Sequence, residues 1–204
     1  MHSYSPRDGH GLAHDPLNSI VAPRPIGWVS TVAQDGTRNL APYSFFNLLN
    51  YRPPIVGFSS TGHKDSVTNA ESTGEFVWNL ATRALAEPMN ETSASVGPEV
   101  DEFALAGLTP EASALVRPPR VAESPVAFEC RVTRIQELTD VDERGVGAWL
   151  VLGEVVQVHI DDSLLVDGVF DTLAADPLLR GGGPADYFTI SQESRLRMTR
   201  PDAR

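Results

Sequence analysis

The segment Thr61-Gly-His-Lys-Asp-Ser66 combines hydroxyl groups, an ammonium group and the start of a short predicted helix over residues 64–73. The free N–H groups of a helix N-terminus attract anions, which gain roughly 0.3 to 1 kcal/mol there. Lys64 adds a full positive charge. The segment therefore indicates an anion site. The alternative is that Asp65 and Ser66 only cap the helix while Lys64 is solvated.

Two further segments, Trp28-Val-Ser-Thr31 and Asn39-Leu-Ala-Pro-Tyr-Ser-Phe-Phe-Asn47, place hydroxyl, amide and aromatic side chains at the ends of neighbouring predicted strands. A flat heteroaromatic ring with polar edges needs this mixture, because polar groups bind its edge while apolar side chains cover its faces. The two segments are consistent with such a ligand. Packing in the core is the alternative for Phe45 and Phe46.

Three other residues have two interpretations each. Arg24, between two prolines that stiffen the chain, either pairs with a phosphate or lies in solvent. His159, late in a β-rich stretch, either contacts a ligand or a subunit interface, or is an ordinary core or surface histidine. Cys130 is the only cysteine and lies in an apolar strand, so we expect it in the core and not as a reactive thiol.

The elements that position these residues are mostly strands. Ile26–Ala33 is β-rich and meets Asp35-Gly36, a strong turn dipeptide, so a hairpin with Arg38–Tyr43 is expected. A loop with Phe45, Phe46 and Leu48 is expected next. The further expected strands are Pro54–Ser59, Glu75–Leu80 and a long hairpin of Val126–Leu138 with Val146–Ile160.

Helical segments are few. Lys64–Thr73 is followed by Gly74, a typical stop signal. Leu85–Ser95 and Asp101–Leu108 are expected as helical pieces, and Thr109–Ser124, with several prolines, as an irregular connection. Short strands with hairpins and few helices favour a mainly β fold, an antiparallel Greek-key-like barrel, because closure removes exposed edges.

Composition excludes several classes of protein. The 204 residues carry a net charge of -11 without a basic cluster, which makes nucleic acid an unlikely ligand. The longest apolar stretch, Trp149–Val158, is far shorter than the roughly 20 residues of a membrane-spanning helix. His10 and His14 lack a third metal ligand. We expect a cytoplasmic protein with a flexible lead-in over residues 1–14 and one domain over residues 15–204.

Taken together, these segments resemble the flavin reductase-like family, whose fold is the FMN-binding split barrel. The resemblance extends over residues 15–187 and includes Gly153-Glu-Val-Val-Gln-Val-His159 and Arg180-Gly-Gly. The run Gly181–Gly183 before Tyr187 departs from the family pattern, so the role of Tyr187 stays open. The matching text is Pro23-Arg-Pro-Ile-Gly-Trp-Val-Ser-Thr31, Asp35-Gly, Asn39–Asn47 and Lys64-Asp-Ser-Val-Thr-Asn69.

The resemblance implies a homodimer that binds FMN near the subunit interface and receives hydride from NADH or NADPH. FAD is an alternative to FMN. Residues implied at or beside the cofactor are Ser30, Thr31, Ser44, Asn47, Lys64, Asp65, Ser66 and Asn69. The candidate cofactor-binding set also includes their neighbours Trp28, Val29, Tyr43, Phe45 and Phe46.

No catalytic side chain is required, since the flavin supplies the chemistry and the protein supplies binding and orientation. The chain has no Gly-x-Gly-x-x-Gly fingerprint, so a nicotinamide donor would bind only transiently. One interpretation is a flavin reductase that passes electrons to a partner such as a monooxygenase. The alternatives are an FMN-containing electron carrier of the flavoredoxin type, and a flavin-binding fold without catalysis.

Overall fold

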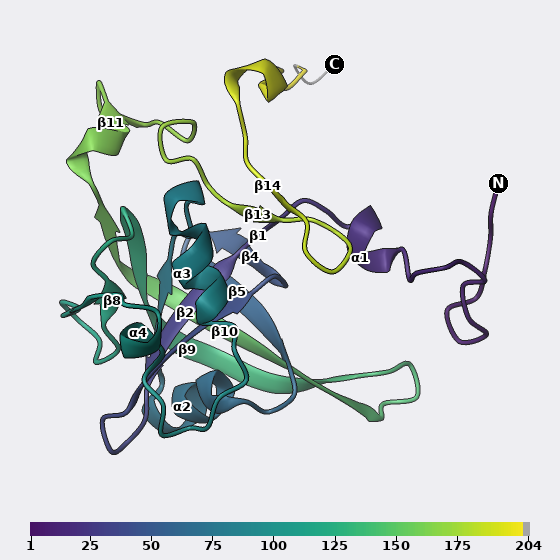
Figure 1. The fold of residues 1–204 in the computed structure, drawn as a ribbon, viewed down its shortest axis with the longest axis horizontal. Helices are drawn as coiled ribbons and strands as arrows, with labels where there is room; N and C mark the ends of the chain where they lie inside the picture. Colours follow the sequence, from purple (N-terminus) through teal and green to yellow (C-terminus); the bar gives the residue numbers. More distant parts are fainter. Residues whose placement is uncertain (202–204) are drawn as a thin grey trace.

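The computed structural model describes residues 1–201, and its centre is one antiparallel sheet of seven strands in the order β3-β2-β6-β9-β10-β5-β4. Figure 1 shows the sheet at the centre, with helices around it. The expected mainly β, antiparallel barrel is confirmed. The strands are β2 (Gly27–Val32), β3 (Arg38–Tyr43), β4 (Phe46–Tyr51), β5 (Pro54–Thr61), β6 (Glu75–Asn79), β9 (Val126–Thr139) and β10 (Gly145–Ile160).

Alternation along the strands separates an inner face from an outer one. Val29 packs with Phe58 and Phe76 in an inner cluster, whereas its neighbour Trp28 packs with Leu40 in a second cluster on the other face. The rings of Phe58 and Phe76 lie 5.6 Å apart, edge to face. Bulky side chains therefore fill the interior of the barrel, and a ligand as large as a flavin has to bind outside it.

Cys130 is fully buried in the inner cluster, which confirms its expected place in the core. Burial raises the pKa of the thiol, because the thiolate would lose its hydration. A thiol that stays protonated is a poor nucleophile. Cys130 is thus a packing residue.

Position 153 has no space for a side chain, because its neighbours lie too close. A Cβ atom there would lie 2.6 Å from Cζ of Phe76 and 3.2 Å from Cβ of Cys130, both fully buried. We expect Gly153→Ala to lower the free energy of unfolding by about 1 to 3 kcal/mol, the usual cost of overpacking. Urea denaturation measures this change, and an unaltered midpoint would contradict the packing described.

Helix α2 (Asp65–Thr73) packs against the barrel, with Val67 and Ala70 fully buried in the inner cluster. Gly74 follows with a φ of 72°, and its N–H donates to the carbonyl of Ala70 at 2.9 Å. Glycine adopts this left-handed conformation without steric cost. The predicted helix and its stop signal are confirmed.

The outer face of β2 and β3 is covered by α3 (Ala86–Glu91) and α4 (Glu102–Leu105), which contribute Met89 and Phe103 to the second cluster. The 3₁₀ turn η1 (Arg83–Leu85) leads into α3. The two helical pieces expected in this part of the chain are present, although shorter than predicted. The connection after them is irregular as expected, apart from the short pair β7 (Pro110–Glu111) and β8 (Arg120–Val121).

The prediction of a loop around Phe45, Phe46 and Leu48 is wrong, because β4 begins at Phe46 and pairs with β5. Its residues are exposed from Asn47 to Tyr51, so the strand lacks the alternation of apolar and polar residues that marks a half-buried strand. The long hairpin of β9 and β10 is confirmed and carries three register shifts.

The terminal parts of the chain form small elements beside the barrel (Figure 1). No helix or strand occurs in residues 1–14. Within residues 1–201, no helix is both long and apolar enough to cross a membrane. The remaining elements are α1 (Leu17–Ile20), β1 (Arg24–Pro25), η2 (Asp162–Leu164), β11 (Leu165–Val166), β12 (Val169–Phe170), β13 (Leu179–Arg180), β14 (Tyr187–Phe188) and η3 (Gln192–Ser194).

Candidate functional site

A cleft of about 380 Å³ lies beside β3, one of the two edge strands of the sheet. Four parts of the chain line it: residues of β3 from Asn39 to Tyr43 except Leu40, the start of α2 from Lys64 to Ser66, the loop of residues 92–98, and Glu102 of α4. The predicted anion segment thus forms part of the cleft wall.

The N-terminus of α2 has no side-chain cap, and the backbone at Lys64 is extended. The first N–H groups of a helix have no intrahelical partner, so those of Asp65 and Ser66 are left for another acceptor. The alternative interpretation of this segment, in which Asp65 and Ser66 cap the helix, does not hold, because neither side chain accepts an N–H group of the first turn among the described residues. Lys64, the only lysine of the chain, is exposed beside these N–H groups.

A buried network of side chains fixes α2 on the two strands beneath it. The amide of Asn69 donates to Oγ1 of Thr31 at 3.1 Å, and the amide of Asn39 donates to Oγ of Ser66 at 2.8 Å and to Oγ1 of Thr31 at 3.2 Å. All four residues are buried. Thr31 and Asn69 therefore support the cleft from below, whereas Ser66 and Asn39 also line it.

Tyr43 faces the cleft from β3 and packs against Phe58, with ring centroids 4.6 Å apart. Burial raises the pKa of its phenol, since the phenolate would be poorly solvated there. The hydroxyl group consequently stays protonated at neutral pH. It lies near the hydroxyl groups of Ser66 and Ser60 as a neutral hydrogen-bonding group.

Three members of the candidate set lie away from the cleft. Trp28, Val29 and Ser30 are fully buried in β2 and are absent from the cleft lining. The indole N–H of Trp28 donates to Oγ1 of Thr92 at 2.9 Å, which ties the loop of residues 92–98 to the strand. Trp28 thus acts on the cleft through that loop.

The remaining candidates, Ser44 to Asn47, lie at the turn into β4 and outside the cleft lining. The ring of Phe46 stacks on that of Trp78, with centroids 5.5 Å apart, so this phenylalanine packs in the barrel wall. Phe45 is 48% exposed. The side-chain oxygen of Asn47 accepts only from the adjacent N–H of Leu48 among the described residues.

Arg24 neither lies free in solvent nor faces the cleft. Its guanidinium donates to the carbonyls of Ser44, Asn18, Val21 and Gly181, and its Cζ lies 5.5 Å from the centroid of Phe45. These carbonyls belong to segments that are far apart in the sequence. The arginine therefore joins the two ends of the chain to the β3–β4 turn.

His159 lies on β10 and contacts a buried carboxylate. Its Nε2 is 2.6 Å from Oε1 of Glu129. Oε1 also accepts the N–H of Ala114, and Oε2 accepts the N–H of Leu115, at 2.6 Å each. Glu129 is fully buried, and His159 is partly exposed. The pair holds the irregular connection against the barrel. Of the two interpretations of His159, this contact supports a structural role within the protein.

Residues that sequence reasoning missed complete the cleft. Ser93 and Ser95 contribute hydroxyl groups from the loop after α3, and Glu102 contributes a carboxyl group. Residues 92–98 show no periodicity or motif, and more than 45 positions separate them from β3. The expected helical piece beginning at Asp101 did locate α4, since the carboxylate of Asp101 caps it at the N–H of Phe103, but it did not indicate that Glu102 lines a cleft.

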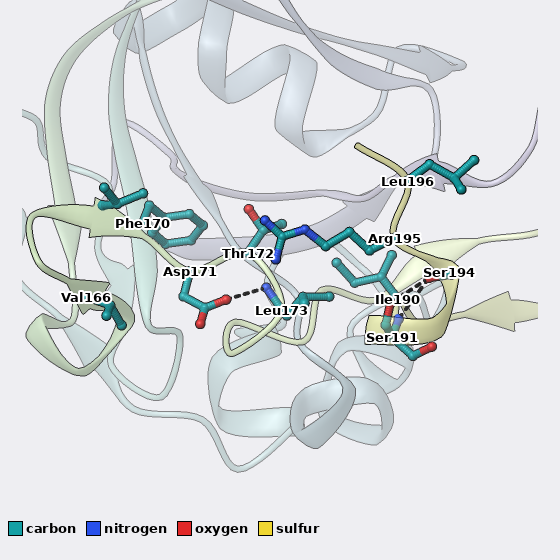
Figure 2. A pocket seen from close by; sticks show the side chains of 11 residues that line it. Val166, Phe170, Asp171, Thr172, Leu173, Ile190, Ser191, Ser194, Arg195 and Leu196 are labelled. Atoms are coloured by element: carbon teal, nitrogen blue, oxygen red, sulfur yellow. Dashed lines mark hydrogen bonds between the residues drawn. The ribbon is translucent and has the colours of Figure 1, made fainter. Parts of the chain in front are cut away.

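A second cavity, of about 490 Å³, lies between the β12 region and the C-terminal segment. Figure 2 shows Phe170 and Leu173 on one side and Ile190 and Leu196 on the other. The carboxylate of Asp171 is engaged by the N–H groups of Leu173 and Ala174. This cavity shares no residue with the β3 cleft, and it holds none of the candidate residues.

Comparison with known proteins agrees with this architecture. The family profile described as a flavin reductase like domain matches residues 20–175. An uncharacterised protein of Aquifex aeolicus is 40% identical over 151 residues, which cover 72% of this chain and 74% of that protein.

Two solved structures extend the comparison. Nitrilotriacetate monooxygenase component B from Bacillus cereus is 30% identical with a TM-score of 0.87, over 96% of this chain and 98% of that chain. A Shewanella frigidimarina protein with a split barrel domain is 27% identical with a TM-score of 0.79, over 90% of each chain.

The antiparallel sheet and its barrel architecture define a split-barrel protein, in which the cleft beside the sheet edge is a candidate ligand site. The profile covers most of the described residues, and the chain belongs to the flavin reductase-like family. The resemblance inferred from the sequence motifs is thereby confirmed.

Proposed function

We propose that this protein is an FMN-dependent oxidoreductase that takes hydride from NADH or NADPH and passes electrons to a partner. The observation that carries the proposal is the cleft at the uncapped N-terminus of α2, which is lined by Lys64, Asp65 and Ser66. Membership of the flavin reductase-like family supports it. The Bacillus cereus relative is by name a component of a monooxygenase, which supports a monooxygenase as the partner.

The donor set fits a phosphate-bearing flavin. Lys64 and the N–H groups of Asp65 and Ser66 supply the charge and hydrogen bonds that a phosphate requires. The protein has a net charge of -11, so its distant carboxylates repel a phosphate. Because salt screens charges beyond about 8 Å, the donors close to the phosphate outweigh that repulsion. We therefore assign the phosphate end of FMN to these three residues.

Other side chains of the cleft suit the uncharged part of the ligand. Tyr43 offers a neutral hydroxyl group, and Ser93 and Ser95 offer hydroxyl groups from the opposite wall. Pro42 and Ala41 add apolar surface. Bound FMN supplies the two-electron redox chemistry, while these residues bind and orient it and exclude water.

The exposed strand β4 supports the proposal of a homodimer. Phe45, Leu48, Leu49 and Tyr51 are between 48% and 72% exposed and lie together at the β4 edge of the sheet. Contiguous apolar residues of this kind favour an interface. We propose that a second copy covers them, and that the candidates Ser44 to Asn47 contact the flavin of the assembled dimer.

The proposed function is tested by adding FMN to the apoprotein and then each nicotinamide under anaerobic conditions. We expect the yellow spectrum of bound flavin, which bleaches with one or both donors. FMN at about 100 times its dissociation constant should add roughly 2.7 kcal/mol to the free energy of unfolding. A flat thermal-shift curve would contradict the cofactor, whereas bound flavin that neither donor bleaches would indicate an electron carrier.

A further inference from the structure

Glu102 is a buried carboxyl group in the wall of the cleft. It is 5% exposed, and its Oε2 accepts the backbone N–H of Leu40 at 3.0 Å. Leu40 lies in β3, whose other side pairs with β2, so this N–H points away from the sheet. The carboxyl group is thus held by the free edge of the strand that forms one side of the cleft.

The described lining of the cleft contains more carboxylates than cations. Among its described lining residues Lys64 is the only cation, and Glu102 and Asp65 are the two carboxylates. Asp101 also lies near Glu102, but Nε of Arg38 donates to it at 2.8 Å. If Lys64 neutralises part of a phosphate, the charge of Glu102 has no cationic partner in the cleft.

We propose that Glu102 makes the cleft discriminate between the two redox states of bound flavin, favouring the oxidised one. This inference depends on the proposed function, and it assigns a specificity role to a residue outside the candidate set. Two-electron reduction with uptake of one proton adds one negative charge to a flavin. A carboxylate in the same cleft repels that charge and weakens binding of the reduced form.

Glu102 lines the same cleft of about 380 Å³ that we propose holds the flavin. Charges closer together than the roughly 8 Å screening length at physiological salt are only partly screened. Two like charges this close, in partly desolvated surroundings, interact more strongly than they would in water. Weaker binding of the reduced form lowers the reduction potential of the bound flavin.

Burial raises the pKa of Glu102, and the nearby carboxylates Asp65 and Asp101 act in the same direction. The other titratable groups facing it are the Tyr43 phenol, which stays neutral, and the ammonium of Lys64. The repulsion should therefore be strong in alkaline solution and disappear as Glu102 becomes protonated.

The experiment compares the wild-type FMN complex with Glu102→Gln, which keeps an oxygen to accept the N–H of Leu40 and removes the charge. Reduction potentials are measured against a reference dye at about pH 8.5 and at a series of lower pH values, because the pKa of Glu102 is raised from its ordinary value. The control is Glu91→Gln, an exposed carboxylate on α3 that is absent from the cleft lining.

At the higher pH we expect Glu102→Gln to improve the affinity for reduced FMN relative to oxidised FMN about tenfold, which raises the potential by about 30 mV. The wild-type and variant potentials should converge as the pH is lowered and Glu102 becomes protonated, and Glu91→Gln should match the wild type throughout. Equal potentials of wild type and Glu102→Gln at the higher pH would overturn this inference alone. Failure of the wild type to bind FMN would overturn the proposed function as well.

If Glu102→Gln does not fold, Glu102→Asn replaces it. Its reduction potential is then compared with that of the wild type, and equal potentials at the higher pH would overturn the inference. The wild type provides a second measurement, the relative affinity for the two redox states as a function of pH. We expect reduced FMN to gain relative affinity as Glu102 becomes protonated, beyond the change that free FMN shows. A pH dependence equal to that of free FMN would overturn the inference.

Discussion

Glu129→Ala is expected to lower the free energy of unfolding by about 2 to 5 kcal/mol, because it leaves buried donors without an acceptor. The carboxylate of Glu129 is fully buried and accepts the N–H groups of Ala114 and Leu115 as well as contacting His159. Removing it also opens a cavity. Urea denaturation at neutral pH measures the loss.

The stabilisation provided by Glu129 should decrease as the pH falls. Burial disfavours the charged form of Glu129, but hydrogen bonds from Ala114, His159 and Leu115 outweigh it and lower the pKa. The contribution is thus complete above the unfolded pKa of about 4.3, and it is lost as the pH falls through the lower folded pKa. The difference in stability between wild type and Glu129→Ala should narrow over this range.

The matched control for Glu129 is Glu137→Ala on the same strand. Glu137 is exposed and accepts the N–H of Gly147 at 2.9 Å. Solvent can replace that bond, so the change should stay within about 0.5 kcal/mol. Equal losses from the two variants would contradict the special position of Glu129.

Lys64→Ala should weaken FMN binding at least tenfold, about 1.4 kcal/mol, and Lys64→Glu at least a hundredfold. The ammonium group is the only cation in the described cleft lining, and reversing its charge adds repulsion to the lost attraction. Fluorescence titration of the apoprotein with FMN gives the dissociation constants. Riboflavin, which has no phosphate, should show a much smaller difference between these variants.

Two observations would separate a binding role of Lys64 from a general charge effect. Arg131→Ala, exposed on β9 and outside the cleft lining, removes the same charge and should leave affinity unchanged. Lys64 is the only lysine of the chain, so FMN should also protect its amine from acylation. An unchanged dissociation constant for Lys64→Ala would contradict the assignment to the phosphate.

Local signals in the sequence predicted most of the fold. Asp35-Gly36 and the flanking β-rich segments located the first hairpin, and Gly74 located the end of α2. The strand β4 was missed because its side chains from Asn47 onward are exposed, which leaves no alternation to detect. Its strand character comes from pairing with β5, a tertiary effect.

The site was less accessible to sequence reasoning. The proposed phosphate site could be predicted, since its candidate donors lie within one short segment from Lys64 to Ser66. The opposite wall consists of residues 92–98 and Glu102, which approach β3 only through the packing of α3 and α4. The sequence could not predict the role of Arg24, because its guanidinium binds backbone carbonyls of distant segments. Every residue type has such a carbonyl, so side-chain identity does not reveal these partners.

The free edge of β3 has a consequence for what can bind there. Pro42 has no N–H to offer, and the outward N–H of Leu40 is already taken by Glu102. Another β-strand needs regularly spaced donors along such an edge and finds them missing. The edge of β3 beside the cleft therefore discourages extension of the sheet by a strand of another protein.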